Sequence, residues 1–473
     1  MVPELRVLSS GEIASIFDRV LEFLSKRGVK IKHKPILKLL DEAGAWVNSN
    51  DEMVRFPRGF VEDLLKKTPH HFSLAAVDEK CDMPCPPKSG SFYMFANSGA
   101  STIIDPDTGT CRDVCISDVR KWGQLVGTLT NIDSTGFQTP SDVPPESIDV
   151  HSLRALLENT SKHVWIQPHS EGSIRYLMDL VIARAGGEES LRERPIASVM
   201  SNSLTPFVFE SMDIEVISQA CRCGIPIHVS SLPVAGGTSP ITIAGSILVA
   251  GIEVLAQVVI AQLIKPGIPV IGLSASLAMD MFSGKALKVS VEAIQSNAGF
   301  VQFMKEAFEI PTHSAGITSD SPILDGQSMI ERSLRGLMIS GVGADMIGRA
   351  GELEGAKIIS PLQLIIDDEI TAMLKRIMCG IEFNEETAGW DDILAISPGG
   401  HFLMEPHTLI HCRNLFRPNL FVHRSGEVWK DLIVIAQDTY RHLSARADTP
   451  TLSPHTCSQM DLIVREADRE LIH

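Results

Sequence analysis

The feature that most constrains the fold is an alternation of short apolar runs with helix-like segments, which starts near residue 131. Seven runs rich in apolar or β-branched residues end in Ser, Gly, Asn or Pro, and they begin near Asn131, His163, Pro195, Pro226, Pro269, Pro311 and Ala344. Segments with helical apolar spacing separate them, at 148–159, 171–185, 207–222, 240–264, 286–308, 327–340 and 361–378. This alternation is typical of βαβ units on a parallel sheet.

Seven or eight such units predict an α/β fold in which the sheet closes into a (β/α)8 TIM barrel. An open doubly wound sheet is the alternative, although no G-x-G-x-x-G motif follows a strand and opens a helix. Either the run at 92–95 or the stretch I-L-A-I-S-P-G-G-H-F at 393–402 supplies the eighth strand. We therefore expect an N-terminal helical and β extension at 1–130, the barrel at 131–424 and a helical tail at 425–473.

The N-terminal extension carries its own start and stop signals. Ser10 is positioned to cap a helix that Gly28 ends, and further helices are expected from Pro35 to Ala43 and from Pro57 to Lys67. Residues 91–104 have β character, and the following D-P-D-T-G sequence predicts a turn.

Charge and cysteine content exclude several classes of protein. The 42 Lys and Arg against 58 Asp and Glu give a net charge of −16, and no basic cluster suggests a nucleic-acid surface. Nine Cys, an odd number in a long chain, argue against a disulfide framework and for the cytoplasm. No Cys pair has zinc-knuckle spacing, so no metal is expected. Residues 240–264 are long enough to cross a membrane, but Glu253, Gln257 and Gln262 favour a buried helix of a protein without a membrane anchor.

In a parallel barrel the active site lies where strands end and loops begin. This rule selects a set of residues that is rich in Ser, Asn, Gln and Gly and poor in charge: Phe137, Gln138, Gln167, His169, Ser201, Asn202, Ser230, Ser231, Ser274, Ser276, 313–316, Gly348 and Arg349. Such a mouth suits a polar or cationic organic molecule bound near a large partner or cofactor.

Five blocks, in order along the chain, resemble the trimethylamine methyltransferase family, the corrinoid-dependent methylamine and betaine methyltransferases. They are S-T-I-I-D-P-D-T-G-T-C-R (101–112), P-T-H-S-A-G-I-T-S-D-S-P-I-L-D-G-Q (311–327), G-A-D-M-I-G-R-A-G-E-L-E-G (343–355), L-I-I-D-D-E-I (364–370) and S-P-G-G-H-F-L-M-E-P-H-T (397–408). The resemblance implies a TIM barrel that moves a substrate N-methyl group to the Co(I) form of a corrinoid. The resemblance also implies that a separate small protein carries this corrinoid and that none is tightly bound to this chain.

The resemblance also bears on the substrate. Family members that act on trimethylamine carry pyrrolysine, whereas Pro322 in the corresponding block here is an ordinary residue. The branch without pyrrolysine includes enzymes that demethylate glycine betaine and related quaternary amines, so the resemblance implies conversion of glycine betaine to dimethylglycine. Proline betaine or carnitine is the alternative substrate, and a catalytically idle relative that binds a betaine or a corrinoid protein is the alternative function. A barrel of unrelated chemistry also stays open, and a homo-oligomer is expected.

When a quaternary ammonium loses a methyl group, the leaving group is a neutral amine, so the site needs no general acid. The cationic substrate is instead held by ring faces and oxygen atoms. Aromatic residues make up only 5% of the chain, which leaves few candidates for such a cage. We expect His313 as the catalytic residue and a substrate-binding set of Tyr93, Phe95, Phe137, Gln138, Gln167, Asp320, Gln327, Arg349, His401, Phe402 and His407. Structural roles remain open for several of them: core packing for Tyr93 and Phe95, a loop hydrogen bond for His313, helix capping for Asp320, and an ion pair to Glu352 or Glu354 for Arg349.

Overall fold

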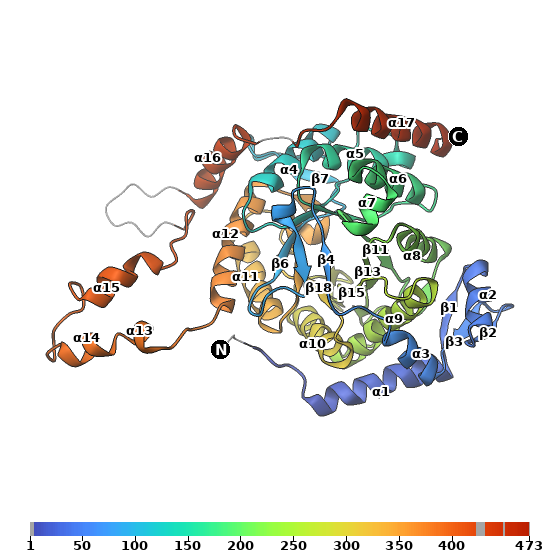
Figure 1. The fold of residues 1–473 in the computed structure, drawn as a ribbon, viewed down its shortest axis with the longest axis horizontal. Helices are drawn as coiled ribbons and strands as arrows, with labels where there is room; N and C mark the ends of the chain where they lie inside the picture. The colour runs from blue at the N-terminus through green and yellow to red at the C-terminus, as the bar shows by residue number, and fades with distance from the viewer. Residues whose placement is uncertain (1–3, 422–430, 448–449, 473) are drawn as a thin grey trace.

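A computed structural model describes residues 4–421, 431–447 and 450–472 of the chain. Its centre is a closed parallel barrel surrounded by helices (Figure 1). Around the barrel the strand order is β10-β11-β13-β15-β18-β19-β6-β9. The bounds of these strands are β6 (Tyr93–Ala96), β9 (Ser134–Gly136), β10 (His163–Ile166), β11 (Ala197–Asn202), β13 (Ile227–Ser231), β15 (Val270–Ser274), β18 (Thr312–Ala315) and β19 (Met346–Ala350).

The closing strand is β6, which pairs in parallel with both β19 and β9. The run at 92–95 therefore supplies the eighth strand, and the alternative at 393–402 is wrong because it contains the end of a helix, α14 (Trp390–Ala395), followed by a loop. Since β6 precedes residue 131, the barrel begins inside the segment that we expected to be an extension.

The expected helices follow the strands in the expected order. Each packs its apolar face on the barrel or on a neighbouring helix, and two helices, α4 (Ile116–Thr128) and the short α7 (Glu188–Glu193), are additions to the expected set. The other bounds are α5 (Ile148–Asn159), α6 (Ile174–Ala185), α8 (Ser211–Cys223), α9 (Ile243–Ile264), α10 (Val291–Phe308), α11 (Gly326–Gly341) and α12 (Pro361–Met378).

Helix α9 is the one described helix that is long and apolar enough to span a membrane, yet it is buried in the core. It packs between the barrel and the helices α1, α3 and α10. Its buried carboxylate is bonded internally: Glu253 accepts hydrogen bonds from Ser203, Thr205 and Ser231, at 2.6–2.8 Å. Satisfied buried polar groups of this kind fix neighbouring segments, so Glu253 holds the loop after β11 against the end of β13.

The N-terminal region packs on one side of the barrel. Helix α1 (Ser10–Lys26) begins with a capping box between Ser9 and Glu12, so Ser9 rather than Ser10 is the cap. Helices α2 (Lys34–Glu42) and α3 (Arg58–Leu65) follow as expected. A small sheet of order β12-β1-β3-β2 joins this region to the barrel, with bounds β1 (Val29–Ile31), β2 (Trp46–Asn48), β3 (Met53–Arg55) and β12 (Val208–Phe209).

A hairpin of β4 (Phe72–Leu74) and β5 (Met83–Cys85) closes the barrel at the amino ends of its strands. Leu74, Met83 and Cys85 belong to one apolar cluster with barrel residues that include Met346, the first residue of β19. This end of the barrel is therefore sealed by apolar packing, and the opposite end is left for a site.

Two small sheets stand at the carboxyl ends of the strands, where the barrel mouth lies. One has the order β14-β16-β17 and is built from the loops after β13 and β15, and the other has the order β20-β21-β7-β8. Their bounds are β14 (Val234–Ala235), β16 (Leu277–Met279), β17 (Ala286–Leu287), β7 (Thr102–Ile104), β8 (Cys111–Asp113), β20 (Glu352–Leu353) and β21 (Ile358–Ile359). The D-P-D-T-G sequence forms the turn between β7 and β8, as expected.

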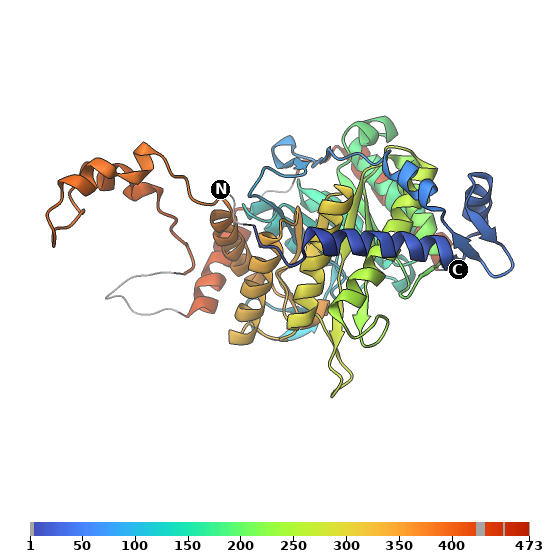
Figure 2. The same ribbon diagram turned by 90° about the horizontal axis from the view of Figure 1, so that it is seen from below.

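Beyond α12 the chain forms an extended arm, which we define as residues 379–418. It contains α13 (Glu385–Ala388), α14 and α15 (Pro406–His411), and it stands away from the barrel in both views (Figures 1 and 2). The tail helices α16 (Leu432–Ser444) and α17 (Pro454–Leu471) return to the barrel, where α16 packs on α12 and α17 packs on α6. The expected barrel segment 131–424 therefore includes an arm that is not part of the barrel.

Candidate functional site

Ring side chains form a layer across the middle of the barrel interior. Phe95 lies 4.9 Å and Trp165 lies 5.1 Å from His313, measured between ring centroids. His228 lies 5.1 Å from the same ring. All four residues are buried, and they come from four different strands. Because strand side chains alternate between the two faces of a sheet, the residues two positions further along face the same interior, nearer the mouth.

The next layer contains polar atoms that lack a partner. Asn202 and Ser230 lie two positions beyond Met200 and His228 on β11 and β13, and Asn97 follows the last residue of β6, two positions beyond Phe95. Among the described residues no hydrogen-bond partner is present for Asn97 Oδ1, Asn202 Oδ1 or Ser230 Oγ, nor for Trp165 Nε1 in the layer below. Buried polar groups are nearly always paired in folded proteins. Four unpaired atoms that face one interior therefore indicate the position of a polar ligand or ordered water.

A chain of hydrogen bonds runs through the barrel interior from the sealed end to His313 in the ring layer. It starts at the main-chain oxygen of Ala75, 2.7 Å from His163 Nδ1. His163 Nε2 and His228 Nε2 each lie 2.9 Å from Ser198 Oγ, and His228 Nδ1 lies 3.2 Å from His313 Nδ1. We refer to His163, Ser198, His228 and His313 as the histidine relay.

The Ala75 carbonyl oxygen, the first acceptor of the relay, determines which nitrogen atom of each histidine carries a proton. A carbonyl oxygen only accepts, so His163 donates from Nδ1 and accepts at Nε2 when its ring is neutral. The Ser198 hydroxyl then donates to His163 and accepts from His228 Nε2, which leaves His228 Nδ1 as an acceptor for His313 Nδ1–H. His313 consequently carries a lone pair on Nε2. A Cβ added at Gly348 would lie 2.6 Å from this atom, so the glycine leaves it the space it occupies.

Burial keeps the relay neutral. Desolvation disfavours the imidazolium form, and it lowers the pKa of His163 to about 4 and that of His313 to about 3. The pKa of His228 is also lowered, by burial and by the two neighbouring histidines. All three rings are therefore uncharged near neutral pH, which is the condition for the proton order deduced above.

Charged side chains meet at one side of the mouth. The buried Glu352 carboxylate accepts from Asn97 Nδ2 at 2.6 Å and from Thr318 Oγ1 at 2.7 Å. Lys288 Nζ lies 3.6 Å and Arg349 Nη1 lies 3.3 Å from its oxygens. Two cations thus flank the Glu352 carboxylate, and the Asp320 carboxylate also acts on Lys288, so the Lys288–Arg349–Glu352 cluster places charges of both signs at this side of the mouth.

Burial and neighbouring charges shift the pKa values of this cluster. Desolvation lowers the pKa of Lys288 to about 8, although the Glu352 carboxylate acts in the opposite direction. The pKa of Glu352 is lowered because Lys288 and Arg349 outweigh its burial. Arg349 has a φ of 86°, a left-handed conformation that is costly for a residue with a Cβ and that recurs at functional sites.

Two buried arginines on α11 support this cluster from behind. Arg332 donates to Asp367 Oδ2 at 2.7 Å and also to the main-chain oxygen of Glu352. Arg335 donates to Ala315 O at 2.7 Å and to the main-chain oxygen of Lys288. These bonds attach the backbones of Glu352 and Lys288 to one helix, so α11 sets the positions of both residues at the mouth.

The sequence is matched over residues 1–470 by the family described as trimethylamine methyltransferase. The chain belongs to the trimethylamine methyltransferase family. It is 32% identical to the trimethylamine methyltransferase MttB of Desulfitobacterium hafniense (strain DSM 10664 / DCB-2), over 89% of this chain and 84% of that relative. It is 26% identical to the glycine betaine methyltransferase of D. hafniense (strain Y51), over 100% and 99% of the two chains.

The fold agrees with this membership. The structure resembles the monomethylamine methyltransferase of Methanosarcina barkeri with a TM-score of 0.52, at 12% sequence identity and with 93% of each chain covered. At this identity the likeness concerns the fold alone. The chain is thus a methyltransferase of the trimethylamine methyltransferase family on a closed eight-stranded barrel.

Four of the predicted site residues lie in or beside the barrel mouth. Phe95 and His313 belong to the ring layer, and Arg349 belongs to the charged cluster, paired with Glu352 rather than with Glu354. Gln167, at the end of β10, receives a weak hydrogen bond from Ser98 at 3.4 Å. Asp320 supports the cluster indirectly, because its carboxylate accepts from the main-chain N–H groups of Lys288 and Val289.

Four other predicted residues do not present their side chains to the interior of the barrel mouth. Tyr93 is at the sealed end, where its hydroxyl donates to Pro84 O. Phe137 points outward into the helix layer, because its neighbour Gly136 pairs with the inward-facing Trp165. Gln138 braces main-chain groups of Asn97 and Ala100. Gln327 is exposed on α11 and donates to Glu331. The structure thus leaves Tyr93, Phe137 and Gln327 away from the mouth, whereas Gln138 holds the backbone around Asn97 in place there.

His401, Phe402 and His407 lie on the arm. His401 and Phe402 are exposed, and His407 bonds only within the arm, to Asp392 Oδ2 through its main-chain N–H and to Glu386 O through Nε2. Within one chain the structure separates these three residues from the mouth. No group of His, Cys, Asp and Glu among the described residues is arranged to hold a metal ion.

Several site residues were missed in the sequence. His228 could have been placed by alternation, since it shares a strand face with Ser230, and Asn97 by the strand-end rule, since it follows the last residue of β6. Lys288 and Glu352 lie in loops, and periodicity gives no signal for them. The expectation of a mouth poor in charge is therefore wrong, because loops and α11 bring in the charged groups.

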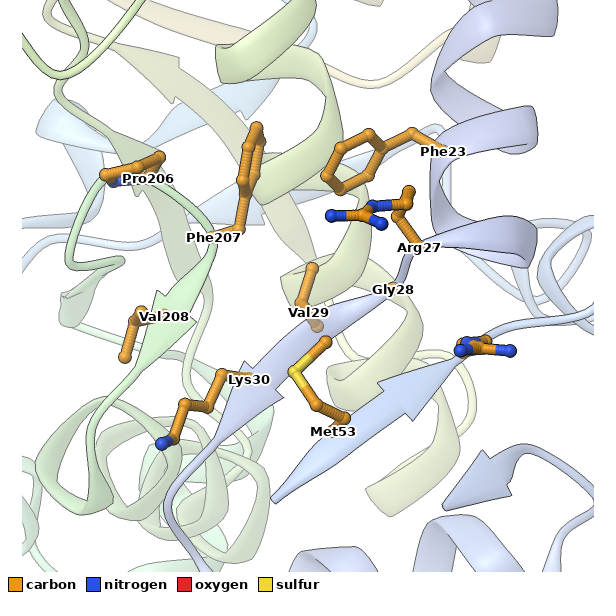
Figure 3. A pocket seen from close by; sticks show the side chains of 10 residues that line it. Phe23, Arg27, Gly28, Val29, Lys30, Met53, Pro206, Phe207 and Val208 are labelled. Carbon is orange, nitrogen blue, oxygen red and sulfur yellow. The ribbon is translucent and has the colours of Figure 1, made fainter. Parts of the chain in front are cut away.

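A separate surface pocket lies between α1 and the segment 206–208 (Figure 3). Phe23 and Phe207 form part of its wall, with their ring centroids 4.4 Å apart. None of the residues that line it belongs to a barrel strand, so this pocket is distinct from the mouth.

Proposed function

We propose that this methyltransferase demethylates a quaternary methylammonium that carries a carboxylate, with glycine betaine converted to dimethylglycine as the leading reaction. The methyl group passes to the Co(I) of a corrinoid carried by a separate protein. The observation that carries the proposal is a neutral ring floor beneath unpaired polar atoms, with the cationic side chains of Lys288 and Arg349 beside it at the mouth.

The two ends of a betaine match these two regions. A methylammonium is attracted to ring faces and to carbonyl oxygens, which the floor offers through Phe95, Trp165 and the Oδ1 atoms of Asn97 and Asn202. The neutral His313 adds no repulsive charge and presents a lone pair. The substrate carboxylate is placed beside Lys288 and Arg349, whose ammonium and guanidinium groups bind carboxylates through charge-assisted hydrogen bonds.

The proposed reaction requires no proton transfer to the leaving amine by the protein. The C–N bond breaks with its electron pair left on nitrogen, so the amine product is neutral and needs no proton. The residues of the mouth hold the substrate, orient one methyl group outward and exclude water. When bound at the mouth, the corrinoid supplies the Co(I) nucleophile that receives the methyl group.

Direct methyl transfer tests this proposal. The protein is mixed with a Co(I) corrinoid and, in separate reactions, with glycine betaine, proline betaine, carnitine or trimethylamine. We expect Co(I) absorbance to fall with one betaine, and the demethylated amine to form in equal amount by mass spectrometry. Betaine binding by calorimetry without transfer would instead support the catalytically idle alternative, and loss of Co(I) with trimethylamine alone would contradict the quaternary substrate.

The affinity for the betaine should depend on pH through Lys288. Since the pKa of this ammonium is lowered to about 8, raising the pH above 8 removes the charge that faces the substrate carboxylate. We expect the dissociation constant to rise about tenfold between pH 7 and pH 9, as measured by calorimetry.

Two variants of Lys288 control this measurement. Lys288→Met should bind weakly at both pH values and lose the pH step, whereas Lys288→Arg should retain binding at pH 9. A pH step that persists in Lys288→Met would assign the titration to another group.

The hairpin between β16 and β17, at the edge of the mouth, is the proposed contact surface for the corrinoid protein. Met281 and Phe282 form the tip of the hairpin between β16 and β17, with 68% and 100% of their surfaces exposed. Exposed apolar residues beside a site are typical of docking surfaces. We expect Phe282→Asp to raise the KM for the corrinoid protein at least tenfold while the betaine dissociation constant is unchanged. Trp46→Asp, on β2 outside the barrel, is the matched control, and an equal effect of both would contradict docking at the hairpin.

The proposal also includes the location and assembly of the protein. We propose that it works in the cytoplasm, in keeping with nine cysteines that are all free thiols. We also propose that it is a homo-oligomer.

A further inference from the structure

The geometry points to the surface that joins the copies of this homo-oligomer. We propose that the arm of one copy packs against helices α11 and α12 of a second copy, and that the second copy returns the same contact. The proposal rests on self-association of the chain and does not depend on the substrate.

The arm has no core of its own. No residue between 379 and 418 is buried, yet twelve of its large apolar side chains are exposed: Ile381, Phe383, Trp390, Ile393, Leu394, Phe402, Leu403, Met404, Leu409, Ile410, Leu415 and Phe416. An ordered segment must offset the entropy cost of its ordering by burying apolar surface. The arm therefore needs an apolar partner surface outside its own residues.

The same chain exposes such a surface beside the base of the arm. Ile330, Leu334 and Leu337 recur at helical spacing along α11, with 62%, 60% and 41% of their surfaces exposed. Met373 and Ile377 continue the surface on the adjacent α12, with 38% and 50% exposed. We refer to these five residues as the stripe. It lies along one face of two neighbouring helices, which is the form of a docking groove for another apolar segment.

Both ends of the arm are fixed next to the stripe. The arm leaves directly from the end of α12, and it returns where Glu369 on α12 accepts from the main-chain N–H groups of Asn419 and Leu420, at 3.0 and 3.2 Å. Between these points it stands away from the barrel (Figures 1 and 2). The arm is thus held in an open position beside the stripe and does not cover it.

A second copy is the partner that satisfies all these surfaces together. Each copy contributes one arm and one stripe, so a two-fold pair covers two arms and two stripes, and no apolar surface of this kind is left over. Twelve large apolar side chains from each arm suit an interface of standard size, about 1,600 Å². A different protein on the arm would leave the stripe exposed.

Photo-crosslinking tests the contact directly in the full-length protein. A photoreactive benzoylphenylalanine replaces Phe383 or, in a second sample, Phe402. We expect a covalent product of twice the chain mass on a denaturing gel, in which the arm is joined to a peptide from α11 or α12. A product of single-chain mass with the same peptide would show that the arm folds back on its own stripe, and a cross-link elsewhere or none would also overturn the proposal.

Light scattering after size-exclusion chromatography tests the energetics. The wild-type mass should be an even multiple of 51.6 kDa, and Leu334→Asp and Ile410→Asp should each lower it with the circular dichroism spectrum unchanged. Leu462→Asp changes a similarly exposed leucine on α17 and should leave the mass as it is. Equal masses for all variants would overturn the proposal. Because betaine binding is measured separately by calorimetry, failure of the substrate proposal would leave these results unaffected.

Discussion

Replacing Arg332 by Met is expected to destabilise the protein by about 3–5 kcal/mol, the usual cost of removing one partner from a buried ion pair. Arg332 and Asp367 are both fully buried, and their nearest atoms are 2.7 Å apart. The variant leaves the Asp367 carboxylate without its countercharge, and it also removes the bond to the main-chain oxygen of Glu352. Thermal unfolding should show a clear fall in melting temperature, together with weaker betaine binding.

The double variant Arg332→Met, Asp367→Leu is the control for this mechanism. It removes both charges, so most of the lost stability should return. Ser333→Ala, at the neighbouring exposed position, should have no effect. If the double variant were as unstable as Arg332→Met, the loss would come from packing and not from an unpaired charge.

The loss of folding stability caused by Arg332→Met should also depend on pH. Burial raises the pKa of Asp367 to about 6 even with Arg332 present, and loss of the arginine raises it further. A carboxyl group whose pKa is higher in the folded state than in the unfolded state costs stability when it ionises, so the cost grows with pH above the unfolded value. We therefore expect the difference in melting temperature from wild type to be smaller at pH 5 than at pH 8.

Replacing His313 by Ala is expected to lower kcat/KM for methyl transfer by about 100-fold, equivalent to about 2.7 kcal/mol. The variant removes one ring from the substrate floor and admits water to the space below the methylammonium. Displacement of a bound substrate by about 1 Å is enough to cause a loss of this size. Single-turnover transfer rates, with the folded fraction measured by circular dichroism, separate this effect from a loss of stability.

Two further variants place the effect in the relay. Ser198→Ala removes the link between His163 and His228 but keeps His313, so we expect a smaller loss of rate. Nitrogen-15 NMR of histidine-labelled protein should show His313 protonated at Nδ1 in the wild type and a mixture of tautomers in Ser198→Ala. His70→Ala, at an exposed histidine, should change neither measurement. A rate that falls only with the folded fraction in His313→Ala would assign this residue a structural role.

Periodicity was sufficient to predict the barrel. Each of the seven strands expected between Asn131 and Ala344 is present, because a strand buried on both faces needs an apolar or β-branched run. The run at 92–95 was harder to assign, since its partners in the barrel are distant in sequence. The boundary at 131 and the inclusion of 379–418 in the barrel segment differ from the structure for the same reason: local patterns do not report which elements pair.

The site could be predicted only in part. The strand-end rule located Asn202, Ser230 and His313, because the carboxyl ends of parallel strands meet at one mouth. It could not distinguish inward from outward residues, so Phe137 was expected to line the site although it faces the helices. Lys288 and Glu352 reach the mouth through loops anchored by Arg332 and Arg335, and these long-range contacts leave no local pattern in the sequence.

The proton order of the relay originates in a main-chain atom far from the mouth. The Ala75 carbonyl cannot be altered by substituting a side chain, so the direction in which the relay donates is a property of the backbone path. The next residue is held by Asp82, which accepts from the Ala76 N–H at 2.8 Å, and by Arg194, which binds both Asp82 and the Ala76 carbonyl. A surface ion pair on the closed side of the barrel thus determines which nitrogen of His313 is free to meet a ligand on the open side.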